Sequence, residues 1–272
     1  MPKVELCRMT WREAEEAFRK NPVILLPLGS IEQHGPHVPV GDYRYAAIVA
    51  KRIAERTGAI AAPTVPWGYS DYFRPFPGTL SLRPETLTLL LQDLCDGFTR
   101  FGLDHLLFVC CHKGNLPIIE QVARRLRETH RLRTATIEPW AWLTPAFKRE
   151  VYGDEKAPIG HGSDPMGSLA MASFPEDVRA DLMEAAPVPG FGGVPFQTSS
   201  VATFEGVPVH VYLDFDEVTQ NGVMGNPKLS SVEGGRKILD RVVEIGSKFV
   251  RQFAAMPTRI EDPPGPRAVK SA

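Results

Sequence analysis

The sequence predicts one α/β domain whose mainly parallel sheet is covered by helices on both faces. Three observations support this fold class. Short apolar runs that read as buried strands alternate with segments of helical period along most of the 272 residues. The strand candidates are apolar runs closed by turn residues, as expected for a sheet that is buried on both faces. The 25 prolines suit a loop-rich α/β protein better than a helical bundle.

Turn and capping residues mark the bounds of these elements. Gly58 and Gly102 each follow a segment of helical period, where glycine often ends a helix. Pro84 lies near the first turn of the third helix, where a missing N–H is tolerated. The last helix opens with the capping-box pattern SSVE at 230–233 and runs to about Phe253. In chain order the candidates are helix 11–22, strand 23–29, helix 43–58, strand 59–68, helix 84–102, strand 105–111, helix 116–130, strand 134–142, helix 165–174, strands and polar loops over 185–225, and the last helix.

Composition narrows the class of protein. A formal net charge of -1 gives no reason to expect a nucleic acid or an anionic membrane as partner. No apolar run is long enough to span a bilayer and no signal peptide is evident, so we expect a cytoplasmic protein. Four irregularly spaced cysteines indicate neither a disulfide framework nor a zinc ribbon. Without a linker or repeat, the chain predicts one domain over 1–260 and a loose tail over 261–272.

Polar side chains follow two predicted strands at the point where each strand ends. Glu32 and His34 come after strand 23–29, and His112 follows strand 105–111. In parallel α/β sheets, ligands bind beyond the carboxyl ends of the strands. Glu32 and His34 are two apart, so an extended segment would point both side chains to the same side. This placement favours a ligand site over a polar turn.

Further candidate ligands precede two of the predicted helices. Asp42 lies before helix 43–58, and His161 and Asp164 lie before helix 165–174. Histidines and carboxylates are the ligand types that zinc and manganese prefer. Each residue taken alone is more often a hydrogen-bonding or capping residue than a ligand. Their joint placement at one rim of the sheet favours a metal site.

Three segments together resemble the creatininase (creatinine amidohydrolase) family: LPLGSIEQHGPHVPVGD, HKGN and GVMGNP. The resemblance extends from MTWREAEEAF to the last helix. It implies a three-layer α/β/α fold, a dinuclear centre with two zinc ions or one zinc and one manganese ion, and hydrolase chemistry. It also implies a homohexamer built as a trimer of dimers. Family members hydrolyse a cyclic amide, a formamide, a peptide bond or a dehydrogenated inositol ring.

The resemblance suggests a role for each matching residue. Glu32 and His34 resemble the family's first Glu and His metal ligands, and His112 resembles the His of its GHGGN segment, here CHKGN. His161 resembles the His of the family's HAGE segment, which acts on protons at the reacting bond. Asp164 stands where that segment has Glu, and is therefore a shorter carboxylate.

The chain departs from the family pattern at three places. The metal-bridging Asp of the family usually lies where this chain has Tyr43, and Asp42 lies one residue earlier. A one-residue deletion in the loop would restore Asp42 to that role, and we favour this interpretation because loops absorb single-residue changes easily. Otherwise the bridge is lost and the centre holds one metal or none. Met166 and Gly167 replace Glu and Thr of many relatives, and Lys113 replaces a glycine. Lys113 would bind an anionic substrate group or point to water. These changes suggest a substrate other than creatinine.

Other polar and aromatic residues lie near the expected site. His37 would support a ligand or be a satisfied turn residue, and Asn115 would cap the next helix or fix the loop. Trp140 and Trp142 would line a substrate pocket, or pack in the core or at a subunit interface. Tyr69, Asp71 and Tyr72 would line the mouth of the site or the pocket of a neighbouring subunit. The candidate substrate-binding residues are therefore Trp140, Trp142, Lys113 and Tyr43.

We expect a metal-dependent hydrolase that cleaves a small cyclic or amide-like C–N bond. By the resemblance, a metal-bridging hydroxide would attack the carbonyl and His161 would pass a proton to the leaving group. One alternative is a hydrolase that opens the ring of a keto-inositol or an oxidised sugar. Another is a metal-poor relative that binds a small molecule without catalysis. We expect two zinc ions per subunit, with manganese as an option at one position, and a small-molecule substrate.

Overall fold

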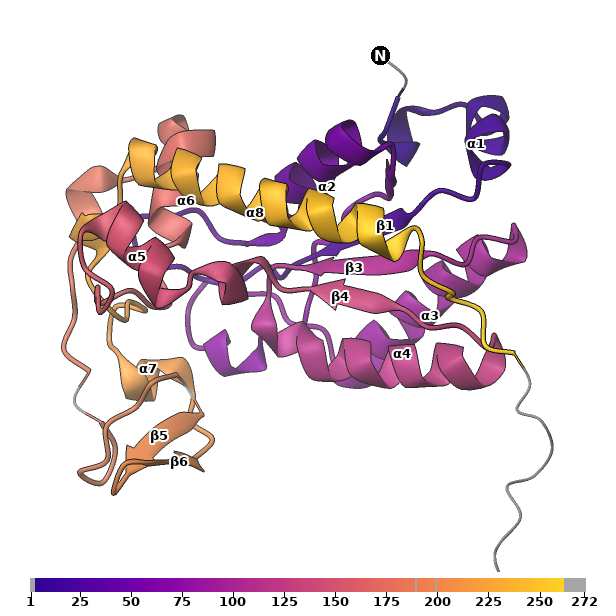
Figure 1. The fold of residues 1–272 in the computed structure, drawn as a ribbon. Coiled ribbons are helices and arrows are strands. Elements are labelled where there is room, and N and C mark those ends of the chain that lie inside the picture. Colours follow the sequence, from indigo (N-terminus) through magenta and orange to yellow (C-terminus); the bar gives the residue numbers. More distant parts are fainter. Residues whose placement is uncertain (1–2, 189, 199, 262–272) are drawn as a thin grey trace, which may run out of the picture.

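The structure, a computed structural model, describes residues 3–188, 190–198 and 200–261. Its centre is a parallel sheet with strand order β2-β1-β3-β4, of which Figure 1 labels β1, β3 and β4. The strands are β1 (Ile24–Leu28), β2 (Ile60–Ala61), β3 (Leu106–Cys110) and β4 (Ala135–Ile137). Every residue of β1 and β3 is buried, which explains why both read as continuous apolar runs.

Helices cover both faces of this sheet, which confirms the predicted fold class (Figure 1). Side chains alternate along the strands, so that Leu107 and Val109 pack on one face while Leu106 and Phe108 pack on the other. The first face packs against α2 (Tyr43–Thr57), α5 (Pro145–Tyr152), α6 (Met166–Ser173) and α8 (Val232–Phe253). The second packs against α1 (Trp11–Phe18), α3 (Pro84–Arg100) and α4 (Leu116–Thr129).

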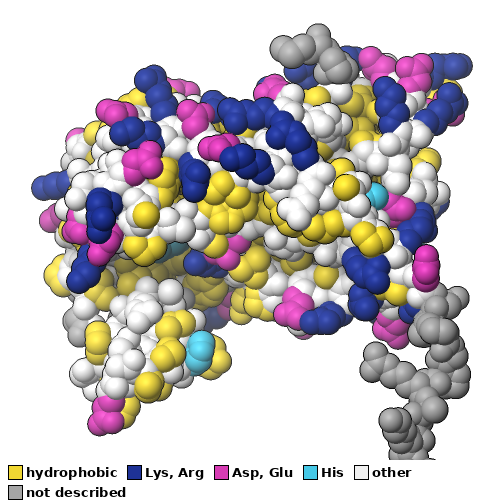
Figure 2. All heavy atoms as spheres, viewed as in Figure 1, with side chains coloured by type: hydrophobic (Ala, Val, Ile, Leu, Met, Phe, Trp, Pro, Cys, Tyr) yellow, Lys and Arg dark blue, Asp and Glu magenta, His cyan; other side chains and the backbone are white. Residues whose placement is uncertain are grey.

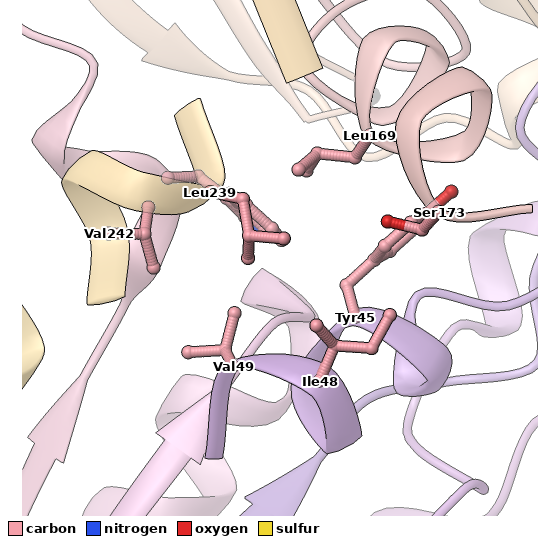
Figure 3. A pocket seen from close by; sticks show the side chains of 8 residues that line it. Tyr45, Ile48, Val49, Leu169, Ser173, Leu239 and Val242 are labelled. Carbon is pink, nitrogen blue, oxygen red and sulfur yellow. The ribbon is translucent and has the colours of Figure 1, made fainter. Parts of the chain in front are cut away.

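The helices on the first face meet in a tight apolar seam. Tyr45 of α2, Leu169 of α6 and Leu239 of α8 converge there (Figure 3). The Tyr45 hydroxyl donates a hydrogen bond to the carbonyl oxygen of Met166 at 3.3 Å. Because α6 begins at Met166, this contact ties the helix that follows His161 and Asp164 to the helix that follows Asp42.

A small hairpin projects from the main body on the side toward which β4 points (Figure 1). It consists of the antiparallel strands β5 (Val201–Phe204) and β6 (Val207–His210), and α7 (Phe215–Val218) follows it. Phe215 and Phe73 belong to a separate apolar cluster that anchors this part of the chain. The hairpin therefore has its own small core, apart from the two cores of the sheet.

Three local details differ from the expected elements. The second strand covers two residues instead of 59–68, since Pro63 and Pro66 offer no N–H for a sheet hydrogen bond. Helix α5, which begins at a Thr144 cap, was not predicted. Helix α8 is capped by Ser231, whose hydroxyl oxygen accepts from Gly234 N at 3.0 Å, so the expected capping box does not form.

Two further expectations concern the ends and surfaces of the chain. A single domain over 1–260 stays a prediction, and the predicted loose tail lies, beyond residue 261, outside the described residues. Within the described part of the chain, no helix is both long and apolar enough to cross a membrane.

Asp104 holds three chain segments together at the amino end of β3. Its carboxylate lies 2.8 Å from Asn21 Nδ2, 2.7 Å from His105 Nδ1 and 2.8 Å from Arg259 Nε. Burial would raise the pKa of Asp104, but the Asn21 hydrogen bond and the His105 and Arg259 charges together lower it below its ordinary value. The ionised carboxylate therefore stabilises the fold.

Replacing Asp104 with Asn is expected to lower the free energy of unfolding at pH 7 by about 1–3 kcal/mol. The pKa is lower in the folded state, so this stabilisation is present above the ordinary Asp pKa of 3.8 and is lost as pH falls through the lowered value. Urea unfolding of both proteins from pH 7 downward measures the difference. Asp240→Asn, on the exposed face of α8, is the matched control and should change stability little. A pH-independent difference would contradict this interpretation.

Candidate metal centre

The two predicted ligand segments leave the sheet side by side. Strands β1 and β3 are parallel neighbours whose last residues, Leu28 and Cys110, are paired. The chain after β1 leads to Glu32 and the chain after β3 leads to His112. As a result, His112 Nδ1 lies 2.7 Å from Glu32 Oε2.

Glu32, Asp42 and His112 form a first group that could hold a metal ion. All three are buried, and His112 Nδ1 lies 3.4 Å from Asp42 Oδ2. Tyr43, at the family's usual position for the bridging Asp, is instead the first residue of α2. The structure thus places Asp42, one residue out of the family register, beside the other candidate ligands.

The tautomer of His112 makes this group suited to a cation. Its Nε2 lies 2.7 Å from the carbonyl oxygen of Tyr69, which can only accept, so Nε2 carries the proton. In the neutral imidazole, Nδ1 then presents a lone pair toward the carboxylates of Glu32 and Asp42. Glu32 Oε2 makes no hydrogen bond with any described residue. The lone pair and the two carboxylates are all electron donors, so they repel one another in a buried site. A proton or a metal ion between them would remove this repulsion.

The pKa values show how strongly these groups interact. Burial would raise the pKa of Glu32, but the His112 charge outweighs it and holds that pKa well below its usual range. Burial and the Glu32 charge raise the pKa of Asp42. Burial would lower the pKa of His112, yet the Glu32 charge raises it well above normal. A divalent cation would neutralise this buried cluster of acids.

Backbone contacts hold the first group in place. Ser30 N donates to Asp42 Oδ1 at 2.6 Å. Asn115 donates through Nδ2 to Gly29 O at 2.9 Å and accepts from Tyr69 N at 2.9 Å. It makes no side-chain cap on the helix that follows, so of the two expected roles it fixes the loop. Asn115 therefore joins the end of β1 to the loop that supplies the carbonyl partner of His112.

Glu32, His34 and His161 form a second group that could hold a metal ion. His34 Nε2 lies 3.3 Å from Glu32 Oε1, so the two oxygens of one carboxylate face different groups. His161 Nε2 lies 2.7 Å from Gln33 O, which leaves Nδ1 without a proton. Burial, followed by the His34 charge, lowers the pKa of His161 to about 3, so its imidazole is neutral.

An aromatic stack surrounds His161. Its ring stacks on His34 at a centroid distance of 4.8 Å and on Phe73 at 4.1 Å. Phe215, from α7, packs edge-on against His161 at 4.9 Å. The small core of the hairpin thus reaches the candidate site. Figure 2 shows a hollow between the hairpin and the main body, with hydrophobic atoms along its walls.

Asp164 belongs to neither group among the described residues. It is fully buried, and its Oδ1 accepts from Ser168 N at 2.9 Å and from the Ser230 hydroxyl at 2.5 Å. Its Oδ2 accepts from the Ser168 hydroxyl at 2.5 Å. His37 is 1% exposed, and neither of its ring nitrogens has a hydrogen-bond partner among the described residues. The predicted roles of Asp164 as ligand and His37 as support stay predictions.

The predicted substrate-binding residues have other contacts in this structure. Lys113 is exposed and lies 3.2 Å from a carboxylate oxygen of Glu138. The Trp140 indole N–H donates to Cys111 O at 2.6 Å, and Trp140 and Trp142 both pack against the first core of the sheet. These contacts favour the packing alternative for the tryptophans. A substrate-binding role for them, for Lys113 and for Tyr43 stays a prediction.

Several site residues carry little sequence signal. Tyr72, whose hydroxyl lies 3.4 Å from His112 Nε2, belongs to a segment that the sequence suggested as the mouth of the site. Burial raises the pKa of Tyr72, so its hydroxyl stays protonated. Phe73 and Phe215 are ordinary apolar residues far apart in the chain, and no local pattern separates them from core residues. Gln33 acts through its backbone carbonyl, which any residue would supply.

The fold and the two ligand groups define a parallel α/β protein with a candidate metal centre at the carboxyl edge of its sheet. Residues 7–250 match the sequence model of the family Creatininase, described as creatinine amidohydrolase. The chain therefore belongs to the creatininase family, which confirms the resemblance seen in its motifs.

Curated relatives in this family have different stated activities. The chain is 30% identical to creatinine amidohydrolase of Pseudomonas putida, with 90% of this chain and 95% of that protein covered. It is 37% identical to the mycofactocin precursor peptide peptidase of Mycobacterium ulcerans, with 82% of each chain covered. It is 24% identical to the 3-dehydro-scyllo-inosose hydrolase of Thermotoga maritima, with 90% of this chain and 82% of that protein covered.

Solved creatininase structures share the fold. A structure described as creatininase Mn has a TM-score of 0.77 and 27% identity, with 92% of this chain and 98% of that chain covered. A mutant creatininase described as Zn-Zn type has the same TM-score and identity, with 93% and 98% covered. The creatininase-like three-layer architecture is thereby confirmed.

Proposed function

We propose that this protein is a metal-dependent hydrolase that cleaves a small cyclic or amide-like C–N bond. The observation that supports this proposal most directly is the buried set of Glu32, His34, Asp42 and His112. Within each of the two groups, the ligand atoms lie within 4.8 Å of one another, close enough to share one metal ion. The names of the relatives from Pseudomonas putida and Mycobacterium ulcerans, an amidohydrolase and a peptidase, support C–N bond cleavage.

The donor set fits zinc or manganese. Two carboxylates and two imidazoles, all buried, are the ligand types of these ions, and the Mn and Zn-Zn creatininases share this fold. We propose two zinc ions per chain, with manganese as an option at one position. When bound, such ions supply a nucleophilic water at neutral pH and polarise the carbonyl of the substrate.

His161 would transfer the proton at the reacting bond. Its Nε2–H is held by the Gln33 carbonyl, and its neutral ring leaves Nδ1 free to accept a proton and pass it on. Phe73 and Phe215 hold the ring between apolar surfaces, so its orientation is restricted. The same aromatic side chains would exclude bulk water from the reacting bond.

Activity assays before and after metal removal test this function. Protein stripped with a chelator should be inactive toward creatinine, N-formyl amides and short peptides, and zinc or manganese should restore turnover of at least one. His161→Ala should lower kcat by about 10²–10⁴-fold, the usual range for loss of a proton-transfer residue. His130→Ala, on the surface next to Asp96, is the matched control and should leave kcat unchanged. Full turnover by the stripped protein would exclude the proposal.

A second candidate is a hydrolase that opens the ring of a keto-inositol or an oxidised sugar. The similarity to the Thermotoga maritima inosose hydrolase, over 90% of this chain, favours it. Turnover of keto-inositols without turnover of any amide would select this alternative. A metal-poor relative without catalysis, the third alternative, would bind neither zinc nor manganese.

We also propose an oligomeric state, a location and a class of partner for the enzyme. We expect a cytoplasmic homohexamer built as a trimer of dimers, with a small-molecule substrate and neither nucleic acid nor membrane as partner. The stated small-molecule activities of two relatives are consistent with such a substrate. Light scattering of the purified protein would measure the size of the oligomer.

A further inference from the structure

We infer that the Tyr72 hydroxyl donates a hydrogen bond to an oxygen atom of the substrate, beside the group of Glu32, Asp42 and His112. The inference rests on the proposed function and assigns Tyr72 a part in substrate binding. The oxygen that it binds is an uncharged carbonyl or hydroxyl oxygen, which amides and sugar rings both carry.

The hydroxyl proton of Tyr72 has no acceptor among the described residues. The hydroxyl oxygen lies 3.4 Å from His112 Nε2. This nitrogen is a donor, because the Tyr69 carbonyl oxygen at 2.7 Å from it can only accept. Tyr72 therefore accepts at its contact with His112, and no described residue accepts a hydrogen bond from Tyr72 in turn. Polar groups at a largely buried site are normally paired, so this proton is available to a ligand.

Neighbouring rings fix the direction of the Tyr72 side chain. Its ring lies at 18° to the His112 ring, with a centroid distance of 6.3 Å. Tyr69 packs edge-on against it at 6.3 Å, and Phe73 packs at 4.5 Å. A donor that is already held in place loses little conformational freedom when a substrate binds, so its hydrogen bond contributes more to affinity.

The backbone at Gly114 leaves room for this hydroxyl. A Cβ at Gly114 would lie 2.9 Å from the Tyr72 hydroxyl oxygen and 2.4 Å from His112 Nε2. On its other side, Tyr72 packs against the apolar cluster that anchors the hairpin. By these contacts Tyr72 lies between the metal-binding group and the hairpin cluster. Figure 2 shows a hollow between the hairpin and the main body, from which a substrate would approach.

The cations closest in sequence to this contact are already paired. Arg74 lies 2.8 Å from a carboxylate oxygen of Asp71 and 2.8 Å from one of Asp214. Lys113 lies 3.2 Å from Glu138. A substrate carboxylate that left water here would need a cation of its own, whereas a carbonyl or hydroxyl oxygen needs only a hydrogen-bond donor. The uncharged hydroxyl of Tyr72 therefore suits an uncharged oxygen.

Steady-state kinetics of the zinc-loaded, full-length Tyr72→Phe protein test this inference. The substrate is whichever of creatinine, N-formyl amides, short peptides and keto-inositols the wild type turns over fastest. KM should rise about 3–10-fold while kcat stays within about twofold, because the lost hydrogen bond holds substrate and transition state alike. The zinc content should not change, since phenylalanine keeps the ring packing. Tyr212→Phe, at an 84% exposed tyrosine beside His210, is the matched control and should leave KM unchanged.

The outcomes separate this inference from the proposed function. An unchanged KM in Tyr72→Phe would overturn the inference while the proposed function stands. A lower zinc content, or a lower kcat at unchanged KM, would also overturn it, because Tyr72 would then act by orienting His112. A zinc-loaded wild type that turns over none of these substrates would overturn the proposed function and the inference with it. Circular dichroism of each variant checks that a change in KM does not reflect loss of the fold.

Discussion

Replacing Glu32 with Gln is expected to remove metal from both candidate metal-binding groups and to reduce hydrolysis to background. Glu32 is the one residue common to the two groups, with Oε1 facing His34 and Oε2 facing His112. The neutral amide has nearly the same shape but lacks the charge that a divalent ion requires. Metal analysis after dialysis, together with the rate of substrate turnover, measures the effect.

The Glu32→Gln protein should still fold. Glu32 is 2% exposed, and glutamine is a neutral group of nearly the same shape, so the side chain still fits. His112, which loses its charged partner, is expected to become neutral. Glu120→Gln, on the exposed face of α4 beside Arg124, is the matched control and should keep its metal and its activity. An unchanged metal content in Glu32→Gln would rule out both candidate positions. Loss of metal in both variants would point to a nonspecific effect.

Replacing Gly29 with Ala is expected to displace Asp42 and to destabilise the fold. A Cβ at Gly29 would lie 2.3 Å from Asp42 Oδ1 and 2.4 Å from the backbone nitrogen of Tyr43. Neither atom can move freely, because Asp42 is held by Ser30 and Tyr43 N belongs to the first turn of α2. Overpacking of this kind costs about 1–3 kcal/mol, and metal binding by the group of Glu32, Asp42 and His112 should weaken as well.

Gly97→Ala gives a matched comparison within the same protein. Gly97 lies inside α3, and a Cβ there would meet nothing within 4 Å among the described residues. Removing an interior helix glycine should stabilise the fold by about 0.5–1 kcal/mol. Urea unfolding and zinc titration of both variants measure the contrast. The interpretation of Gly29 would be wrong if the two substitutions changed stability in the same direction.

Much of the fold was predictable because burial leaves a local signal. Residues 24–28 and 106–110 are buried on both faces, so each strand is a continuous apolar run. Helix α2 was predicted within one residue, because helical spacing of apolar residues ends at Gly58, which adopts φ 78°. Helix α5 is largely exposed, so it leaves no pattern that is distinct from the surrounding loops. The strand at 60–61 was predicted, but as part of a longer strand over 59–68.

The part of the candidate site that directly follows the ends of β1 and β3 was predictable from the sequence. Glu32 and His112 follow neighbouring parallel strands, and the register of Leu28 with Cys110 brings them together. The sequence favoured Asp42 as a ligand, because loops absorb single-residue changes easily. Its contact with His112 depends on the folded loop and was seen only in the structure. The environment of Asp164 was not predictable, since its serine partners include Ser230, 66 residues away.

The amino-acid sequence alone specified the family, the class of sheet and the residues Glu32, His34 and His112, because these follow from local apolar patterns and short motifs. Tertiary structure decided which carboxylates face those residues. It placed Asp42 beside His112 and turned Asp164 toward the starts of α6 and α8. It also packed Phe73 and Phe215 around His161. The physical reason is that the direction of a buried side chain depends on partners from distant segments, which become neighbours only when the chain folds.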